Sequence, residues 1–258
     1  MPDLTYLYAV AREPLPCPPG VAGAPVRTVT SSGLVAYVSS VPLEQFGEEP
    51  LRRSLEDLDW LAETARAHHR VVDAVAAATT TAPVRLVTVY GDDAQVAELL
   101  ERRAAAFAEV LAHVTGRREW GVKAYSSPQE EPVNAGERHG GGRTCEGDRQ
   151  AARPGTAYLQ HRRATLRGRE QARRQALQRA DHIHRALTAL AAAGHRHRAQ
   201  DPRLSGRDDV MLLNGAYLVD EAREEEFAAR AGELGGDGVE IRLTGPWAPY
   251  SFTVMEPA

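Results

Sequence analysis

The sequence predicts an α+β fold in two domains, residues 1–117 and 118–258. Three observations lead to this prediction. Short apolar segments with a period of two indicate strands, and two long segments with apolar residues at three- and four-residue steps indicate amphipathic helices. Between the second of these helices and the strand before it, residues 127–155 carry no apolar periodicity. Helices on one face of each sheet would bury both apolar stripes.

The first domain begins with strands. Residues 4–10 are apolar, aromatic and short, as in a buried strand. Residues 26–30 and 34–39 flank Ser31-Ser-Gly33, and this arrangement predicts a hairpin, since glycine accepts the positive φ of a tight turn.

Two helices and a strand complete the first domain. Residues 51–78 carry one apolar stripe at helical spacing, with carboxylates near the start where they oppose the helix dipole. Residues 84–90 predict a strand that Gly91 ends. Asp92 or Asp93 then caps a helix that stops near Gly116.

The second domain is predicted to be ferredoxin-like, with an interrupted last strand. The segment 127–155 is rich in Gly, Pro, Glu and Arg and is predicted to be a mobile insertion. The predicted elements are a strand at 119–125, a long helix at 157–193, a strand at 210–219, a short helix at 221–232 and a closing strand from 239.

The last strand contains prolines. Pro246 and Pro249 remove amide donors and must interrupt the ladder or lie at a sheet edge. Tyr250 and the apolar residues after it then resume a period of two, which indicates that they close the second sheet. For Trp247, held between the prolines, two interpretations stay open: a side chain that completes a core, or an aromatic contact for a partner protein.

Bulk composition excludes several classes of protein. With 43% hydrophobic and 26% charged residues, the chain is globular, and no apolar run approaches the length of a membrane span. The N-terminus resembles no secretory signal, and two cysteines make no disulfide framework. We therefore expect a cytoplasmic protein without membrane association. A net charge of −4 argues against general nucleic-acid binding.

Patterns typical of catalysis or metal binding are missing. His182 and His184 are about 200° apart around a helix and cannot share a metal ion. No Gly-x-Ser-x-Gly elbow is present, and Gly140-Gly-Gly142 lacks the lysine of a phosphate loop. Cys17 and Cys145 lie in loop contexts that do not activate a thiol. The sequence predicts no enzyme, no metal and no cofactor.

An arginine-rich stretch of the second long helix is the other candidate binding site, besides the aromatic residues near Trp247. From Arg149 to Arg198 there are twelve arginines and two acids. Three interpretations stay open: a solvated basic face, a surface that binds acidic helices such as the Glu224–Glu226 region of another copy, or a nucleic-acid-binding face on a ferredoxin-like module. The candidate partner-binding residues are Trp247, Tyr250, Arg162, Arg163, Arg167 and Arg173.

Taken together, these segments resemble the GvpL/GvpF family of gas vesicle proteins. The resemblance spans the chain outside 127–155, and its most specific part is Gly245-Pro-Trp-Ala-Pro-Tyr-Ser-Phe252. The other matching segments are Leu4–Val10, Gly33–Ser39, Phe46-Gly47, Asp57–Leu61, His69–Val72, Glu119–Lys123, and Tyr158-Leu159 with Arg162-Arg163.

The resemblance implies a non-enzymatic accessory or minor structural protein of gas vesicle assembly. Its implied partners are the hydrophobic shell protein GvpA and other accessory Gvp proteins, and self-association is a further expectation. A shell subunit with an apolar surface aggregates unless a partner covers that surface or nucleates the wall. Protein–protein interaction, rather than nucleic-acid binding, is therefore the expected activity.

Overall fold

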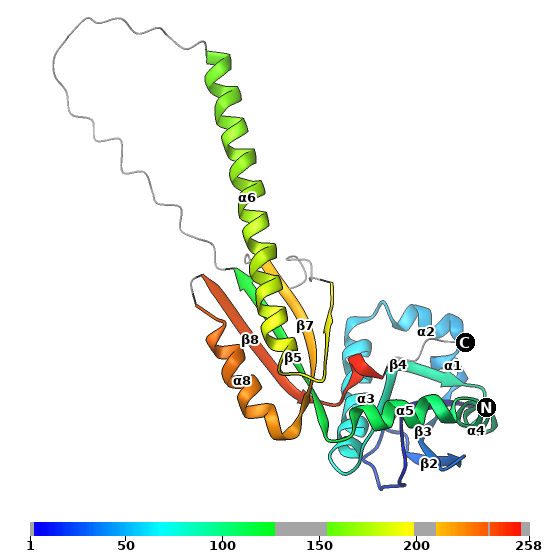
Figure 1. Ribbon diagram of the computed structural model, residues 1–258. Helices are drawn as coiled ribbons and strands as arrows, with labels where there is room; N and C mark the ends of the chain where they lie inside the picture. Colours follow the sequence, from blue (N-terminus) through cyan, green and yellow to red (C-terminus); the bar gives the residue numbers. More distant parts are fainter. Residues whose placement is uncertain (1–2, 127–153, 199–209, 237, 254–258) are drawn as a thin grey trace, which may run out of the picture.

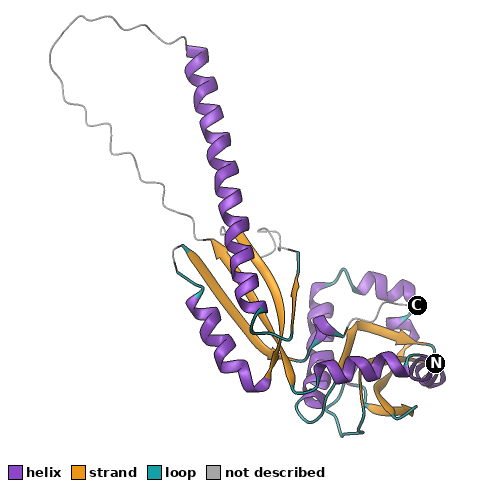
Figure 2. Cartoon of the chain, viewed as in Figure 1, coloured by secondary structure: helices purple, strands orange, loops and turns teal. Residues whose placement is uncertain are grey.

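The computed structural model describes residues 3–126, 154–198, 210–236 and 238–253. These residues form two four-stranded antiparallel sheets with helices packed on them, so the mixed α+β character is confirmed (Figures 1 and 2). The described part of the chain holds no helix with the length and apolarity needed to cross a bilayer.

The N-terminal sheet has the strand order β2-β3-β1-β4. Its strands are β1 (Asp3–Ala11), β2 (Arg27–Ser31), β3 (Leu34–Pro42) and β4 (Ala82–Tyr90). The hairpin predicted between β2 and β3 is present, and Ser32 and Gly33 both take positive φ in its turn, at 53° and 70°. Strand β1 lies between β3 and β4, which explains why its side chains from Tyr6 to Ala11 are all buried.

Helices cover both faces of the N-terminal sheet, so the prediction of helices on one face is wrong for this half. Side chains of α3 (Leu58–Ala76) pack on the face with Tyr6 and Tyr8, while α4 (Asp93–Arg102) and α5 (Ala104–Val114) cover the face with Leu7 and Val10. The alternation along β1 assigns its side chains to the two clusters, with a shift in phase at the bulge between Leu7 and Ala9.

The first predicted long helix is broken. In its place are α2 (Glu48–Ser54) and α3, preceded by the single turn α1 (Leu43–Phe46). Helix α3 begins after its N-cap Asp57, whose carboxylate accepts hydrogen bonds from the amides of Asp59 and Trp60 at 3.0 and 3.2 Å. This carboxylate satisfies amides that a helix start leaves without partners. The following predicted helix is likewise divided, at Arg103.

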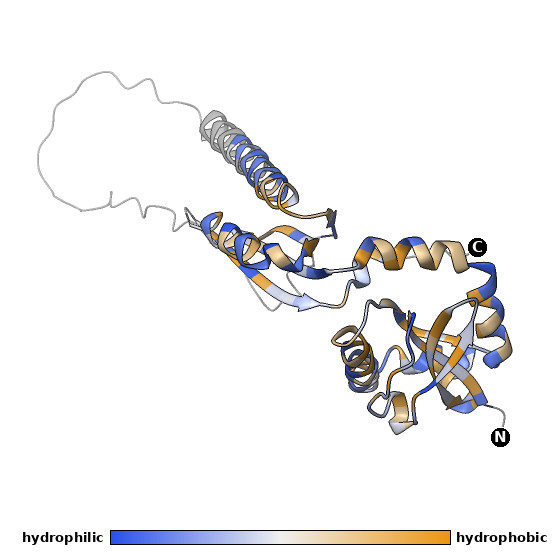
Figure 3. Ribbon diagram, turned by 60° about the horizontal axis from the view of Figure 1, so that its bottom comes forward, coloured by the Kyte–Doolittle hydropathy of each residue, from blue (hydrophilic) through white to orange (hydrophobic). Residues whose placement is uncertain are grey.

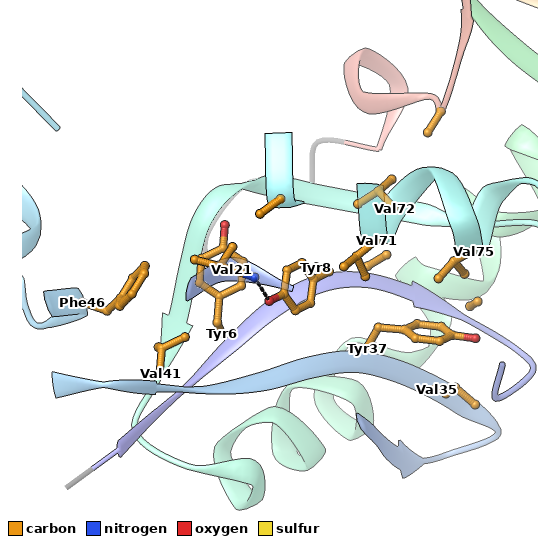
Figure 4. Close-up of a cluster of buried hydrophobic side chains, with 14 residues drawn as sticks. Tyr6, Tyr8, Val21, Val35, Tyr37, Val41, Phe46, Val71, Val72 and Val75 are labelled. Carbon is orange, nitrogen blue, oxygen red and sulfur yellow. Dashed lines mark hydrogen bonds between the residues drawn. The ribbon is translucent and has the colours of Figure 1, made fainter. Parts of the chain in front are cut away.

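Tyrosines fill the cluster beneath α3 (Figure 4). The hydroxyl of Tyr8 accepts a hydrogen bond from the Val21 amide at 2.8 Å and donates one to Ser39 Oγ at 3.1 Å. Tyr6 lies against Tyr8 with ring centroids 4.8 Å apart. The Tyr6 hydroxyl accepts a hydrogen bond from the Val87 amide at 3.1 Å. Both hydroxyls therefore have hydrogen-bond partners inside the protein, which allows tyrosine to be buried there.

The C-terminal sheet has the strand order β6-β7-β5-β8. Its strands are β5 (Arg117–Ser126), β6 (Ala193–Arg196), β7 (Val210–Asp220) and β8 (Val239–Trp247). Strand β6 was not predicted from the sequence: the second long helix, α6, spans Pro154–Thr188 and ends before it. His195 lies in β6 and His197 directly after it.

Helices α6 and α8 (Glu224–Glu233) pack on one face of the C-terminal sheet, as predicted. Ile183 and Leu187 of α6 join Phe227 of α8 and Tyr217 of β7 in the cluster on this face. The short 3₁₀ turn Glu221–Arg223 precedes α8. Of the predicted insertion 127–155, residues 127–153 lie outside the described residues, while Pro154 and Gly155 begin α6.

Replacing Tyr8 by Phe tests the hydroxyl network of the first core. Tyr8→Phe leaves the Val21 amide without its acceptor in a buried position, which costs about 1–3 kcal/mol of unfolding free energy. Urea unfolding followed by circular dichroism measures this cost. The control Tyr90→Phe removes a hydroxyl from a half-buried position outside the network and should change stability by less than about 0.5 kcal/mol. Equal effects of the two substitutions would contradict the assigned role.

Candidate partner-binding site at the junction of the two sheets

The end of β8 is distorted where it meets β5. Thr244 pairs with Gly121 and Trp247 pairs with Glu119, so two residues of β8 lie opposite one of β5. Gly245 has φ of 122°, and a Cβ atom there would lie 2.8 Å from the carbonyl oxygen of Glu119. Glycine is required at this bulge because only it tolerates both the φ and the close approach.

Beyond the bulge, the chain leaves the C-terminal sheet. Tyr250 was predicted to resume the strand and close that sheet, and this is wrong. Tyr250–Phe252 form a 3₁₀ turn, η3, and Tyr250 packs against the core beneath α3 of the N-terminal half. The period of two over so few residues did not distinguish a strand from a turn that follows Pro249.

We call residues 247–253 the linking segment, because they contact both sheets. On the N-terminal side, Ala248 is buried in the α3 core and Thr253 Oγ1 donates a hydrogen bond to the Pro83 carbonyl at 2.8 Å. On the C-terminal side, Glu119 Oε2 accepts a hydrogen bond from the Ser251 amide and Glu119 Oε1 accepts one from Ser251 Oγ, each at 2.7 Å. The position of η3 between the two halves is visible in Figure 1.

Glu119 is half-buried where it meets the linking segment. Burial raises the pKa of its carboxyl above the ordinary value, although the two Ser251 hydrogen bonds act in the opposite direction. Ser251 Oγ also lies 3.3 Å from His197 Nε2, and burial together with nearby His195 lowers the pKa of His197.

This Ser–His–Glu group is not arranged as a nucleophilic triad. In a triad, the carboxylate orients the histidine, and the histidine takes the proton of the serine. Here Ser251 contacts both Glu119 and His197, and its hydroxyl proton is donated to the carboxylate. The geometry holds a chain segment in place, and no group of three or more His, Cys, Asp or Glu residues suited to a metal occurs among the described residues.

His68 and His69 of α3 contact the aromatic side chains of the linking segment. His68 is 2% exposed, and its Nδ1 lies 3.0 Å from the Tyr6 hydroxyl. The ring centroid of Tyr250 lies 6.1 Å from the ring centroids of His68 and His69. Burial lowers the pKa of His68 to about 4, because the apolar surroundings disfavour the charged imidazole. His69 forms an ion pair with Asp73 at 3.0 Å when protonated.

Trp247 is the large apolar side chain of the linking segment that stays open to solvent. Its ring lies 5.5 Å from the ring of His69, and it remains 44% exposed. Its position between two prolines and against α3 restricts its motion. An exposed, partly supported tryptophan is the type of side chain that is enriched at the centre of protein interfaces.

A cleft of about 700 Å³ opens beside Trp247, between the end of α3, the start of β5 and the 3₁₀ turn Glu221–Arg223. Its arginines are engaged, since Arg117 pairs with Asp220 at 2.8 Å and Arg118 with Glu221 at 3.4 Å. Asp73 is a further charged residue of the wall. The rest is mainly small side chains, threonine hydroxyls and prolines, from Ala76–Thr81, Pro246, Ala248 and Pro249. The two arginines and the two acids of the lining balance in charge, so the cleft offers no excess of either sign to an ionic ligand.

The structure separates the sequence-predicted site residues into two groups. Trp247 and Tyr250 both lie at the junction, Trp247 exposed and Tyr250 half-buried. The arginines lie on α6, a helix that extends beyond the C-terminal sheet (Figure 1). Arg167 is exposed, whereas the side chains of Arg162, Arg163 and Arg173 lie outside the described residues.

The Glu119–Ser251 contact escaped sequence reasoning. The two residues are 132 positions apart, and neither belongs to a recognisable motif. The acidic residue at the start of a strand and the serine after a proline carry no signal of their mutual contact. The spacing Pro246-Trp-Ala-Pro249 indicated an interruption but not its direction.

Comparison with known proteins defines the class of protein. The sequence model of the family described as "Gas vesicle synthesis protein GvpL/GvpF" matches residues 4–254. The chain therefore belongs to the GvpL/GvpF family of gas vesicle proteins.

Relatives agree with this assignment. Gas vesicle protein L of Streptomyces sp. (strain CB03234) is 42% identical, over 96% of this chain and 92% of that protein. Gas vesicle protein L1 of Halobacterium salinarum is 28% identical, over 90% and 82% of the two chains.

Two solved structures share the fold. The crystal structure of GvpF from Anabaena sp. PCC7120 matches with a TM-score of 0.67 at 18% identity, covering 99% of this chain and 98% of that one. GvpF from Microcystis aeruginosa matches with a TM-score of 0.65 at 19% identity, covering 98% and 99%.

Acid should destabilise the protein through His68. Its pKa is about 4 in the folded chain, against the ordinary 6.5 of a solvated histidine, so the unfolded chain binds a proton between these values and the folded chain does not. The contribution of His68 to stability is complete above pH 6.5 and is lost as the pH falls toward 4. Between pH 7 and 5 this amounts to about 2 kcal/mol of unfolding free energy.

Urea unfolding at pH 7 and pH 5 measures this loss. His68→Gln should lose less stability between the two pH values than the wild type does, because the buried titrating group is gone. The matched control His182→Gln replaces an exposed imidazole and should keep the wild-type pH dependence. If His68→Gln shows the same pH dependence as the wild type, the burial argument fails.

Proposed function

We propose that this chain is a non-enzymatic accessory protein of gas vesicle assembly that binds the hydrophobic shell protein GvpA and other Gvp proteins. By covering apolar shell surface it would chaperone the subunits or nucleate the wall, at the forming vesicle in the cytoplasm. The family membership supports the gas vesicle role. The observation that carries the binding role is Trp247, which is 44% exposed beside a cleft whose charged residues balance.

The proposal also includes an organisation into two domains, 1–117 and 118–258. Along the chain, the elements from β5 to β8 follow the order strand–helix–strand–strand–helix–strand, and the strands lie in the sheet in the order β6-β7-β5-β8. Both orders support a ferredoxin-like second domain. Strand β5 begins at Arg117, only three residues after α5 ends at Val114, so the domains are joined by a short connection. The linking segment supplies a second connection between them.

Physical chemistry favours an apolar partner at Trp247. The indole can bury further area against a partner, and burial of apolar area contributes about 25 cal/mol per Å². The His69 ring and the prolines already restrict the indole, so less conformational entropy is lost on binding. The shell protein is the Gvp protein expected to offer apolar surface.

Trp247→Ala should weaken GvpA binding without unfolding the chain. Truncation of a central interface tryptophan typically costs about 2 kcal/mol or more, roughly a 30-fold loss of affinity. Recovery of co-expressed GvpA with the tagged chain measures the effect, and circular dichroism checks the fold. Val210→Ala, which shortens a side chain that is 59% exposed on another strand, is the matched control and should bind normally.

Two outcomes would contradict the proposal. If the wild-type chain recovers neither GvpA nor any other Gvp protein, the assembly role fails. If the folded Trp247→Ala variant recovers GvpA as well as the Val210→Ala variant does, GvpA binds elsewhere and the assignment of the site fails.

A further inference from the structure

Helix α6 is longer than the sheet that it packs on. It has 35 residues, about 52 Å at 1.5 Å per residue, and it extends beyond the C-terminal sheet (Figure 1). Among its described side chains, the buried ones are Ala180, Ile183 and Leu187, all in the last turns. Before these turns, most of the described side chains are exposed, including Leu177 at 55%, and the described ribbon is mainly hydrophilic (Figure 3).

A projecting helix of this kind needs an external surface. Helices without a packed face are marginal in water, since most helical stability in proteins comes from burying such a face. The sequence of α6 contains eight arginines against Glu170 and Asp181, so its neighbours must also tolerate a strong positive charge. The surface that fits α6 is therefore acidic and carries exposed apolar groups.

The turns from α1 to the start of α3, residues 43–63, have both properties. Leu43, Leu55 and Leu58 are exposed by 40%, 44% and 77%. The same stretch carries seven exposed acids against two arginines; the acids are Glu44, Glu48, Glu49, Glu56, Asp57, Asp59 and Glu63. We call this the α1–α3 surface. Its leucines match Leu177 and its charge is opposite to that of α6.

The start of α8 is a weaker complement, although Glu224, Glu225 and Glu226 also follow one another there. Glu226 is already paired with Arg223 at 3.0 Å, and Phe227 is fully buried in the second core. Among the described residues, no large exposed apolar side chain lies within α8. Charge alone would hold α6 at this place, without a contact for Leu177.

Within one molecule, α6 cannot reach the α1–α3 surface. Its free end points away from the N-terminal half, while the α1–α3 surface lies on that half (Figure 1). We propose that α6 of one copy docks on the α1–α3 surface of a second copy, with Leu177 against the exposed leucines and the arginines against the carboxylates. The contact joins two different surfaces, so it propagates head to tail into open rows or rings.

This arrangement gives the chain a means of presenting several Trp247 side chains in one row. Association is driven by opposite charges on exposed surfaces, and it therefore weakens as salt screens them. The proposal is independent of the GvpA-binding role, because Trp247 belongs to neither surface.

Sedimentation velocity of the full-length wild type, from about 1 to 100 μM, tests the proposal. We expect concentration-dependent association at about 50 mM NaCl and a monomer at about 500 mM, where charges on exposed surfaces are screened. Two variants each reverse two charges of one surface: Arg167→Glu with Arg174→Glu on α6, and Glu56→Lys with Glu63→Lys on the α1–α3 surface. Neither pair of substitutions removes a helix-capping side chain seen in the structure.

Each variant alone should be monomeric at the lower salt concentration, since the altered surface loses most of its net charge and each substituted side chain faces like charges on the other surface. Mixing the two variants should restore association, because each reversed surface meets a reversed complement on the other variant. Glu224→Lys with Glu225→Lys is the matched control on α8 and should associate like the wild type. Circular dichroism confirms that each variant keeps its helices.

Three results would overturn the proposal. The first is a wild type that stays monomeric over the whole concentration range at the lower salt concentration. The second is reversal of either surface without effect on association. The third is loss of association in the α8 control together with normal association of the Glu56→Lys, Glu63→Lys variant, which would place the acidic complement on α8.

Discussion

The docking of the linking segment between the two sheets is the interaction on which the rest of the structure depends. Ser251 gives Glu119 two hydrogen bonds of 2.7 Å, while Tyr250 and Ala248 complete the core beneath α3. The carboxylate accepts both bonds away from most of the solvent, where charge-assisted hydrogen bonds are strong and their loss is costly. A segment at the end of the chain thereby joins elements that are separated by more than 100 residues.

This constraint explains the exposure of Trp247. The bulge at Gly245 turns the chain out of β8, and the anchors on either side of Trp247 leave its indole at the edge of the cleft. A flexible tail would fold such an indole back onto apolar surface. The path set by these anchors instead keeps it available, which links the segment Gly245–Phe252 to a structural role and to the proposed contact with GvpA.

Much of the fold could be predicted from local patterns, and the errors share a physical cause. The hairpin at Ser32-Gly33 and the strands β1, β5 and β7 follow from turn chemistry and period-two apolar residues. Strand β6 was missed because four residues, Ala193–Arg196, are too few to show a period. The helix break at Asp57 was missed because long-range packing, rather than local propensity, decides whether a helix continues. The same holds for the path after Pro249, where packing decides that the chain leaves the sheet.

The candidate site could be predicted only in part, for the same reason. Aromatic residues held between prolines drew attention to Trp247 and Tyr250, but nothing local reveals that Tyr250 belongs to the core of the other half. Glu119, Ser251 and His68 have no motif, since their roles arise from contacts between distant segments.

Hydrogen exchange of the full chain tests the bridging role of the linking segment most directly. The measurement compares the wild type with the double variant Tyr250→Ala/Ser251→Ala and with the control Ser126→Ala. The account predicts faster exchange in both α3 and β5 for the double variant alone, whereas faster exchange confined to residues 239–253 would contradict it.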